Sequence, residues 1–217
     1  MRKDAYFISL EGGEGTGKST QIILLRDRLE KLGIEVISTR EPGGCDSAEL
    51  IRDFVLTGDT DRWTPMTEAL LFTAARKEHT HRVIKPTLEK GKWVITDRYF
   101  DSTLAYQGGG HGLGIAKMRE LTRLALDNFE PDMTLILDID IETGLKRAGN
   151  RLTETSSSED RFERMGTPFH QTLRQAMLTI AEREPERCSV IDASGDIEQV
   201  HQRIWSAVSQ RFELQDA

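Results

Sequence analysis

Short apolar runs alternate along the chain with longer segments in which apolar residues recur every three or four positions. The short runs are nearly continuous rather than alternating with polar residues, which is typical of strands that helices cover on both faces. They predict strands at Ala5–Leu10, Glu35–Ser38, Trp93–Thr96, Met133–Leu137 and Ser189–Ile191.

The longer segments between these runs predict amphipathic helices, because one face of each is apolar. Gly33 follows the last apolar position of the first helix and is expected to end it. The three clearest apolar faces are Ile22, Leu25, Leu29 and Leu32; Met118, Leu121 and Ala125; and Ile197, Val200, Ile204 and Val208. The alternation predicts an α/β fold, a doubly wound parallel sheet with ligands outside the carboxyl ends of its strands. Because the 217 residues contain no internal repeat and no linker, we expect a single domain spanning residues 1–217.

A glycine-rich loop stands between the first predicted strand and the first predicted helix. Residues 12–19 read GGEGTGKS, which satisfies the phosphate-loop pattern G-x-x-x-x-G-K-[ST] in the context that the pattern requires. The glycines let several backbone N–H groups point inward, and the helix that follows adds its positive end. Lys18 is expected to contact the β- and γ-phosphates of ATP, and Ser19 to offer a hydroxyl to Mg²⁺. The predicted ATP-binding residues are Gly12, Gly13, Glu14, Gly15, Thr16, Gly17, Lys18, Ser19 and Thr20.

A guanine-nucleotide switch protein is not expected. Such a protein would read guanine with Asn-Lys-x-Asp, but the two Asn of this chain, Asn128 and Asn150, are followed by Phe129 and Arg151. The phosphate loop therefore predicts a nucleotide site but does not by itself predict a reaction.

Two carboxylates end predicted strands and are candidates for holding Mg²⁺ or its water shell. Asp97 follows the strand Trp93–Thr96, and Asp138 follows the strand Met133–Leu137. A carboxylate at this position of a P-loop protein is suited to the metal. Asp97 is the predicted metal residue together with Ser19, and Asp138 is the alternative that the sequence leaves open.

Basic and aromatic residues lie near the same predicted sheet edge. Arginine grips phosphate through two parallel hydrogen bonds and neutralises charge that develops during phosphoryl transfer, so Arg40, Arg76 and Arg98 are candidates for that role. Arg98 is the strongest of them because Asp97 places it at a strand end. The loop that follows is rich in aromatic and amide groups suited to a sugar and a base, namely Tyr99, Tyr106 and Gln107 before Gly108–Gly110.

A basic segment late in the chain predicts a lid over the phosphates. Lys146–Arg164 carries five basic residues around the Ser-rich stretch Thr153–Asp160, which we expect to be a mobile loop. A lid at about residues 148–161 would bring arginine to ATP and exclude water. The alternative is a solvated, charged helix end.

Composition limits the partners of the chain. Its formal net charge of −7 disfavours sequence-independent binding of DNA or RNA, which needs a basic face. Cys45 and Cys188 show no metal-ligand spacing and are typical of a reducing compartment. With no apolar run near the ~18 residues of a membrane span, we expect a cytoplasmic protein with no membrane partner.

Seven segments in their order along the chain resemble the thymidylate kinase family, over roughly Phe7 to Val208. The most specific is the Asp-Arg-Tyr, Ser-Thr and Tyr-Gln-Gly-Gly-Gly series within residues 94–110. The segments are LEGGEGTGKST at 10–20, REPGG at 40–44, LLFTAARKEH at 70–79, VITDRYFDSTLAYQGGG at 94–110, LDIDIETGLKR at 137–147, DRFE at 160–163 and VIDA at 190–193. The resemblance implies a P-loop NTPase fold with a five-stranded parallel sheet, a homodimer, and Mg²⁺-dependent phosphorylation of dTMP to dTDP with ATP.

The resemblance also implies roles for individual residues. Phe72 looks like the aromatic residue that stacks on thymine, Arg76 like the donor to a thymine carbonyl, and Arg98 like the acceptor-phosphate arginine. Tyr106 would lie against the deoxyribose and disfavour a 2′-hydroxyl. The implied substrate-binding set is Phe72, Arg76, Arg98, Tyr99, Ser102, Thr103, Tyr106 and Gln107.

Glu14 occupies an acidic position of the phosphate loop that is similar to bacterial-type members, in which lid arginines supply the catalytic charge. The implied catalytic set is Lys18, Glu14, Arg98, Arg151 and Arg161. The lid departs from the family pattern because it is longer and contains Thr153–Ser158. We expect direct in-line transfer to the anionic phosphate oxygen of dTMP, with Glu14 positioning the metal or a water molecule. Two alternatives stay open: a kinase for another nucleoside or nucleotide, and a non-catalytic nucleotide-dependent regulator.

Overall fold

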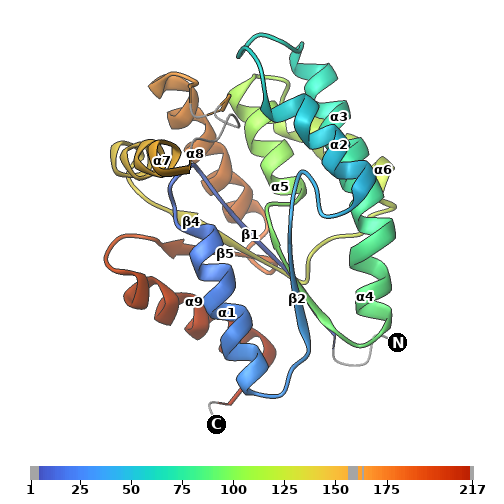
Figure 1. The fold of residues 1–217 in the computed structure, drawn as a ribbon, viewed down its shortest axis with the longest axis vertical. Coiled ribbons are helices and arrows are strands. Elements are labelled where there is room, and N and C mark those ends of the chain that lie inside the picture. Colours follow the sequence, from blue (N-terminus) through green and yellow to red (C-terminus); the bar gives the residue numbers. More distant parts are fainter. Residues whose placement is uncertain (1–4, 156–160, 163, 216–217) are drawn as a thin grey trace.

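The computed structural model describes residues 5–155, 161–162 and 164–215. In this part of the chain, five parallel strands form one sheet in the order β2-β3-β1-β4-β5 (Figure 1). The strands are β1 (Phe7–Gly12), β2 (Val36–Arg40), β3 (Trp93–Asp97), β4 (Met133–Asp138) and β5 (Cys188–Asp192). The predicted doubly wound α/β fold is confirmed. Because the winding reverses beside β1, the cleft outside its carboxyl end is the expected ligand site.

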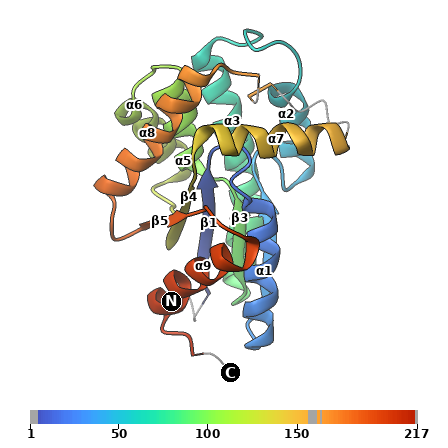
Figure 2. The same cartoon turned by 90° about the vertical axis from the view of Figure 1, so that its left-hand side faces the viewer.

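Helices cover both faces of this sheet (Figures 1 and 2). They are α1 (Lys18–Lys31), α2 (Asp46–Leu56), α3 (Pro65–His79), α4 (Lys85–Glu89), α5 (Phe100–Thr103), α6 (Ile115–Leu126), α7 (Ile141–Thr155), α8 (Thr167–Arg183) and α9 (Ile197–Phe212). Two π-helical segments, Thr80–Ile84 (η1) and Leu104–Gly110 (η2), continue α3 and α5.

Two hydrophobic cores fill the space between the sheet and its helices. On one face, Leu25 of α1 and Ile204 of α9 pack against Ile8 and Leu10 of β1. On the other face, Phe7 packs in a core with residues of α3, α5, α6 and α8. The short apolar strands are therefore covered on both sides, as their continuous apolar pattern predicts.

The first strand extends beyond its predicted end. The sequence reading stopped it at Leu10 because Glu11 is charged, but β1 continues to Gly12 and the Glu11 side chain is fully buried. Two donors from the chain after β3 satisfy this carboxyl group: the Tyr99 backbone N–H at 2.7 Å and the Ser102 hydroxyl at 2.6 Å. A buried polar group persists when it is hydrogen-bonded in this way.

The predicted lid begins as a helix. Thr153–Thr155 belong to α7, so the prediction of a loop across these three residues was wrong. The apolar positions Ile141, Leu145, Ala148 and Leu152 keep helical spacing and outweigh the polar composition of the segment. The remainder of the predicted loop, residues 156–160, lies outside the described residues. Figure 2 shows α7 crossing the carboxyl-end edge of the sheet near the start of α1.

Candidate functional site: a phosphate loop joined to an aromatic cleft

The phosphate loop follows β1 and ends where α1 begins. Gly17 precedes α1 with a left-handed φ of 88°, and Gly15 has a φ of 68°. A Cβ atom on Gly15 would overlap the carbonyl oxygen of Gly144 in α7, so glycine is needed there to let the loop pack against that helix. The Lys18 ammonium donates to the carbonyl oxygens of Gly12, at 3.3 Å, and Gly13, at 3.0 Å. Burial and the nearby Arg98 lower the pKa of Lys18, although acidic neighbours oppose this.

A hydroxyl and a carboxylate suited to a metal ion meet beside this loop. Ser19 Oγ, in the first turn of α1, donates to Asp97 Oδ2 at the end of β3, at 3.1 Å. Asp97 Oδ1 is buried and has no hydrogen-bond partner among the described residues. The competing carboxylate of Asp138 is instead bonded to Arg174 through both oxygens, at 2.6 and 2.8 Å. This geometry favours Asp97 over Asp138 as the residue near Mg²⁺.

The described residues contain no group of three or more His, Cys, Asp or Glu side chains arranged to hold a metal ion. Ser19 and Asp97 nevertheless fit Mg²⁺ bound in the manner of P-loop proteins, in which one or two protein oxygens act together with substrate phosphates and water.

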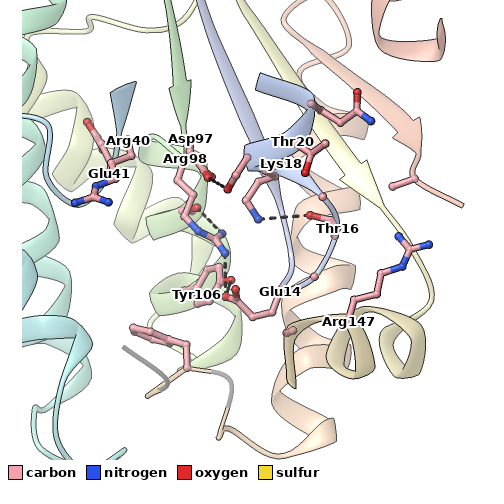
Figure 3. A pocket seen from close by; sticks show the side chains of 18 of the residues that line it. Glu14, Thr16, Lys18, Thr20, Arg40, Glu41, Asp97, Arg98, Tyr106 and Arg147 are labelled. Atoms are coloured by element: carbon pink, nitrogen blue, oxygen red, sulfur yellow. Dashed lines mark hydrogen bonds and ion pairs between the residues drawn. The ribbon is translucent and has the colours of Figure 1, made fainter. Parts of the chain in front are cut away.

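Arg98, Glu14 and Tyr106 converge at the mouth of the phosphate loop (Figure 3). Arg98 Nη2 donates to Glu14 Oε1 at 2.9 Å, and the Tyr106 hydroxyl donates to the same oxygen at 2.6 Å. Arg98 Nη1 also donates to the Gly12 carbonyl at 2.9 Å and to Ser102 Oγ at 3.2 Å. Burial raises the pKa of Tyr106 well above its usual value, with Glu14 adding to the effect and Arg98 opposing it, so the phenol stays protonated.

The buried carboxylate of Glu11 is connected to this cluster through the hydroxyl of Ser102. Burial and the neighbouring carboxylate of Asp101 raise its pKa to about 7, although the hydrogen bond from Ser102 and the charge of Arg98 lower it. The group therefore changes protonation near neutral pH, in a position that connects the end of β1 to the backbone of Tyr99.

A cavity of about 1170 Å³ extends from the phosphate loop to an aromatic cleft. This volume exceeds the ~300–1,000 Å³ typical of a site for one small ligand. Its lining contains most of the residues predicted to bind a substrate: Phe72, Arg76, Arg98, Ser102, Thr103, Tyr106 and Gln107. The same lining contains the phosphate-loop residues from Glu14 to Thr20, together with Arg40 and Asp97. The tertiary structure thus brings the predicted substrate-binding residues and the phosphate loop, which are far apart in the sequence, into one cavity.

Tyr99 does not line this cavity and is fully buried in the hydrophobic core, so the predicted direct contact with a substrate is not supported. Its ring packs edge-on against Phe7, and its hydroxyl is hydrogen-bonded to Thr80 at 2.8 Å. Tyr99 follows Arg98, whose φ of 67° is left-handed, and its backbone N–H donates to Glu11.

Arg161 also lies elsewhere than predicted. Its guanidinium is 1% exposed and forms an ion pair with the buried Glu68 of α3. The remaining N–H groups donate to the carbonyl oxygens of Val55, Asp59 and Thr60, at 2.9–3.2 Å. Arg161 is therefore held by the α2–α3 region and does not contact the phosphate loop. Arg151 belongs to α7, but its side chain is outside the described part of the structure.

The sequence reading missed one wall of the cavity. The loop after β5 and the first turn of α9 line it through Ala193 and Gly195–Glu198, and the Gln21 amide of α1 donates to the Ile197 carbonyl at 2.9 Å. Arg147 of α7 lines it from another side (Figure 3). The rule that ligands bind beyond the carboxyl ends of parallel strands would have found the loop, had it been applied to β5.

The parallel sheet, the phosphate loop at its switch point and the Lys18–Ser19–Asp97 group define a P-loop nucleotide-binding protein with room for a second ligand. The family model for thymidylate kinase matches residues 10–204. The chain is 48% identical over 209 residues to the thymidylate kinase of Caulobacter vibrioides, covering 96% of this chain and 98% of that protein. It is 46% identical over 211 residues to the enzyme of Syntrophotalea carbinolica, covering 97% and 98%. The chain belongs to the thymidylate kinase family.

A solved structure supports this assignment at the level of the fold. The crystal structure of thymidylate kinase from Ehrlichia chaffeensis superimposes with a TM-score of 0.77 at 31% sequence identity, covering 95% of this chain and all of that chain. The predicted family resemblance and the predicted five-stranded sheet are thus confirmed.

Proposed function

We propose that this protein transfers the γ-phosphoryl group of ATP to the phosphate of dTMP, giving ADP and dTDP. The observation that carries the proposal is one continuous cavity in a member of the thymidylate kinase family. One end of the cavity is a phosphate loop, and the other is an aromatic cleft with buried polar groups suited to a base. A shared cavity allows donor and acceptor phosphates to meet without water between them.

ATP occupies the phosphate-loop end. Backbone N–H groups of the loop and the start of α1 hold the phosphates, and Lys18 moves from its carbonyl partners to the β- and γ-phosphates. Ser19 and Asp97 hold Mg²⁺ or its water shell, which neutralises phosphate charge when bound. Residues Gly195–Glu198 and Arg147 line the same cavity, which supports a role for them in bordering the remainder of the donor nucleotide.

dTMP occupies the aromatic end. Phe72 lies at the wall as a stacking surface, and Arg76, Thr103 and Gln107 present polar groups beside it. Arg98 holds the acceptor phosphate close to the phosphate loop. The Tyr106 hydroxyl is bonded to the same Glu14 oxygen as Arg98. This position beside the acceptor-phosphate arginine supports a contact of Tyr106 with the deoxyribose.

The transfer is in line and needs no strong general base, because the attacking phosphate oxygen is already anionic at pH 7. Arg98 and Lys18 stabilise charge from two sides of the loop. Glu14 orients Arg98 and Tyr106 and positions a water molecule or the metal. Arg151 is the predicted lid arginine at ATP. Arg161 can take that catalytic role only by leaving its ion pair with Glu68.

We also propose a homodimer in the cytoplasm. Helices α2, α3 and α6 are neighbours (Figure 1). Each carries exposed apolar side chains: Leu50 and Phe54 on α2, Leu70 on α3 and Leu124 on α6. Exposed apolar side chains on adjoining helices support a second copy of the chain as the partner that covers them. The free thiols of Cys45 and Cys188 support a reducing compartment. No described helix is long and apolar enough to cross a membrane.

The test is ADP release with Mg·ATP and a panel of dTMP, dUMP, UMP, CMP, AMP and thymidine. We expect strong stimulation by dTMP and weaker stimulation by dUMP. Activity with thymidine or CMP but not dTMP would overturn the acceptor while keeping the fold. ADP release that no acceptor stimulates would instead favour a nucleotide-dependent regulator.

A further inference from the structure

Arg76 lines the cavity and yet is only 2% exposed, and other side chains accept hydrogen bonds from two of its three guanidinium nitrogens. Its Nε donates to Glu41 Oε2 at 2.6 Å, and its Nη1 donates to Thr103 Oγ1 at 2.8 Å. Its Nη2 has no partner among the described residues. The plane of the guanidinium is therefore fixed, and one nitrogen is left to donate to a ligand.

Glu41 is itself held by a second side chain. Its Oε1 lies 2.9 Å from His79 Nδ1, and His79 Nε2 lies 2.8 Å from Thr39 Oγ1. Because an ionised carboxylate only accepts hydrogen bonds, Nδ1 carries a proton and donates to Glu41. When the ring is neutral, Nε2 then accepts from the Thr39 hydroxyl. The result is a directed chain of hydrogen bonds from the end of β2 to Arg76 on α3.

The backbone on both sides of this hydrogen-bond series is also fixed, at Glu41 and at Gly44. The Glu41 N–H donates to the carbonyl oxygen of Asp97 at 2.8 Å, which fixes Glu41 relative to the end of β3. Gly44 has a left-handed φ of 84°, and a Cβ atom there would overlap the imidazole of His79. The histidine is thus packed against the backbone at Gly44 as well as bonded at both ring nitrogens.

A buried ion pair of this kind is a poor way to stabilise a fold. The side chains of Arg76 and Glu41 are 3% and 2% exposed, and the desolvation of two charges offsets much of their attraction. The arrangement provides orientation instead, because a directional hydrogen bond fixes each side chain in the series from Thr39 to Arg76. Such fixation is useful where a single N–H must meet one atom of a ligand.

We propose that Glu41 and His79 are positioning residues for the acceptor base: they hold Arg76 so that its Nη2 donates to a thymine carbonyl oxygen. This inference rests on the proposed function of the aromatic cleft. Neither residue needs to contact the base, since both oxygens of Glu41 and both ring nitrogens of His79 are occupied within the chain. Their effect is on the affinity for dTMP and not on ATP.

The experiment measures KM for dTMP, KM for ATP, kcat and Tm for Glu41→Gln, Arg76→Ala and the double variant. Glu41→Gln keeps the shape but removes the charge that holds Arg76. We expect it to raise KM for dTMP roughly tenfold while KM for ATP changes less than about twofold. In the double variant KM for dTMP should equal that of Arg76→Ala alone, because Glu41 acts through Arg76. Glu35→Gln, which removes an exposed partner of Lys92, is the matched control and should change nothing.

A second pair of variants tests His79. His79→Asn retains a donor near the Nδ1 position, and His79→Phe does not. We expect His79→Phe to raise KM for dTMP and His79→Asn to restore most of the loss. His81→Asn, at an exposed position two residues away, is the control. If Glu41→Gln does not fold, Thr39→Val breaks the far end of the same chain at a half-buried site and should raise KM for dTMP in the same direction.

The outcomes separate this inference from the proposed function. An unchanged KM for dTMP in Arg76→Ala would overturn the assignment of the base pocket, and the inference with it. A large effect of Arg76→Ala with no effect of Glu41→Gln would overturn only the inference. Losses that are additive in the double variant, or that affect dTMP and ATP equally along with a lower Tm, would mean that Glu41 is merely structural and would also overturn it.

Discussion

The buried ion pair between Arg161 and Glu68 leads to a stability prediction that the family resemblance alone does not contain. Replacing Arg161 with Ala would remove the arginine from the fully buried Glu68 carboxylate, which among the described residues would keep only the Gln107 amide at 2.8 Å and His111 Nε2 at 3.2 Å. It would also leave the buried Val55 carbonyl without its donor, whereas those of Asp59 and Thr60 are within reach of water.

The magnitude follows from the uncompensated charge. Breaking a buried pair by removing one partner costs about 3–5 kcal/mol. For a chain of 217 residues each kcal/mol lowers Tm by roughly 2–4 °C, so Arg161→Ala should lower Tm by about 6–20 °C. Arg164→Ala is the matched control, because Arg164 is exposed and donates a hydrogen bond to the Gly58 carbonyl. It should cost less than about 1 kcal/mol.

Urea denaturation followed by fluorescence, with Tm from calorimetry, measures both variants. A difference between Arg161→Ala and Arg164→Ala below about 1 kcal/mol would refute the reasoning. The double variant Glu68→Gln, Arg161→Met should recover part of the loss, because replacing both charged partners of a buried pair is often neutral. If the double variant is instead less stable than Arg161→Ala, the loss does not come from the stranded carboxylate.

Three further predictions follow from the same site. Lys18→Met should lower kcat by at least roughly a hundredfold, because it removes the ammonium that in this structure is bonded to the loop carbonyls and the hydroxyl of Thr16 and that is proposed to contact the phosphates. Steady-state assays with unchanged activity would contradict it. Tyr106→Phe removes one of the hydrogen bonds to Glu14 and should lower kcat/KM for dTMP about tenfold, a change of about 1.4 kcal/mol; equal values for the two proteins in matched assays would exclude that role. Burial raises the pKa of Glu11 from 4.5 to about 7, so the folded chain binds more protons than the unfolded one between these values and its unfolding free energy should fall as pH rises through that window. Urea titrations at pH 5 and pH 8 measure the change in unfolding free energy between these two pH values. Glu11→Gln should make this change smaller, and an equal change in the two proteins would show that Glu11 does not cause it.

The sequence by itself determined the strands, the phosphate loop and the family. These features are local: a continuous apolar run is read from neighbours in the chain, and the loop from Gly12 to Ser19 needs only a strand before it and a helix after it. Phe72 and Arg76 were predicted as base contacts from the family resemblance, which rests on contiguous letters of one motif. The phosphate loop lies at the cavity because strand ends in a parallel sheet meet at one edge, and Phe72 and Arg76 reach the same cavity from α3.

Tertiary structure decided which polar groups are buried and with whom they pair. Tyr99 and Arg161 stand in motifs beside residues of the cavity, yet one fills the core and the other binds Glu68. Glu11 belongs to a strand although its charge suggested an end, because two donors 88 and 91 positions away satisfy it. Spacing along the chain does not encode such long-range pairing, since it depends on how the helices pack over the sheet. The same holds for the series of hydrogen bonds from Thr39 through His79 and Glu41 to Arg76, which exists only once the end of β2 meets the end of α3.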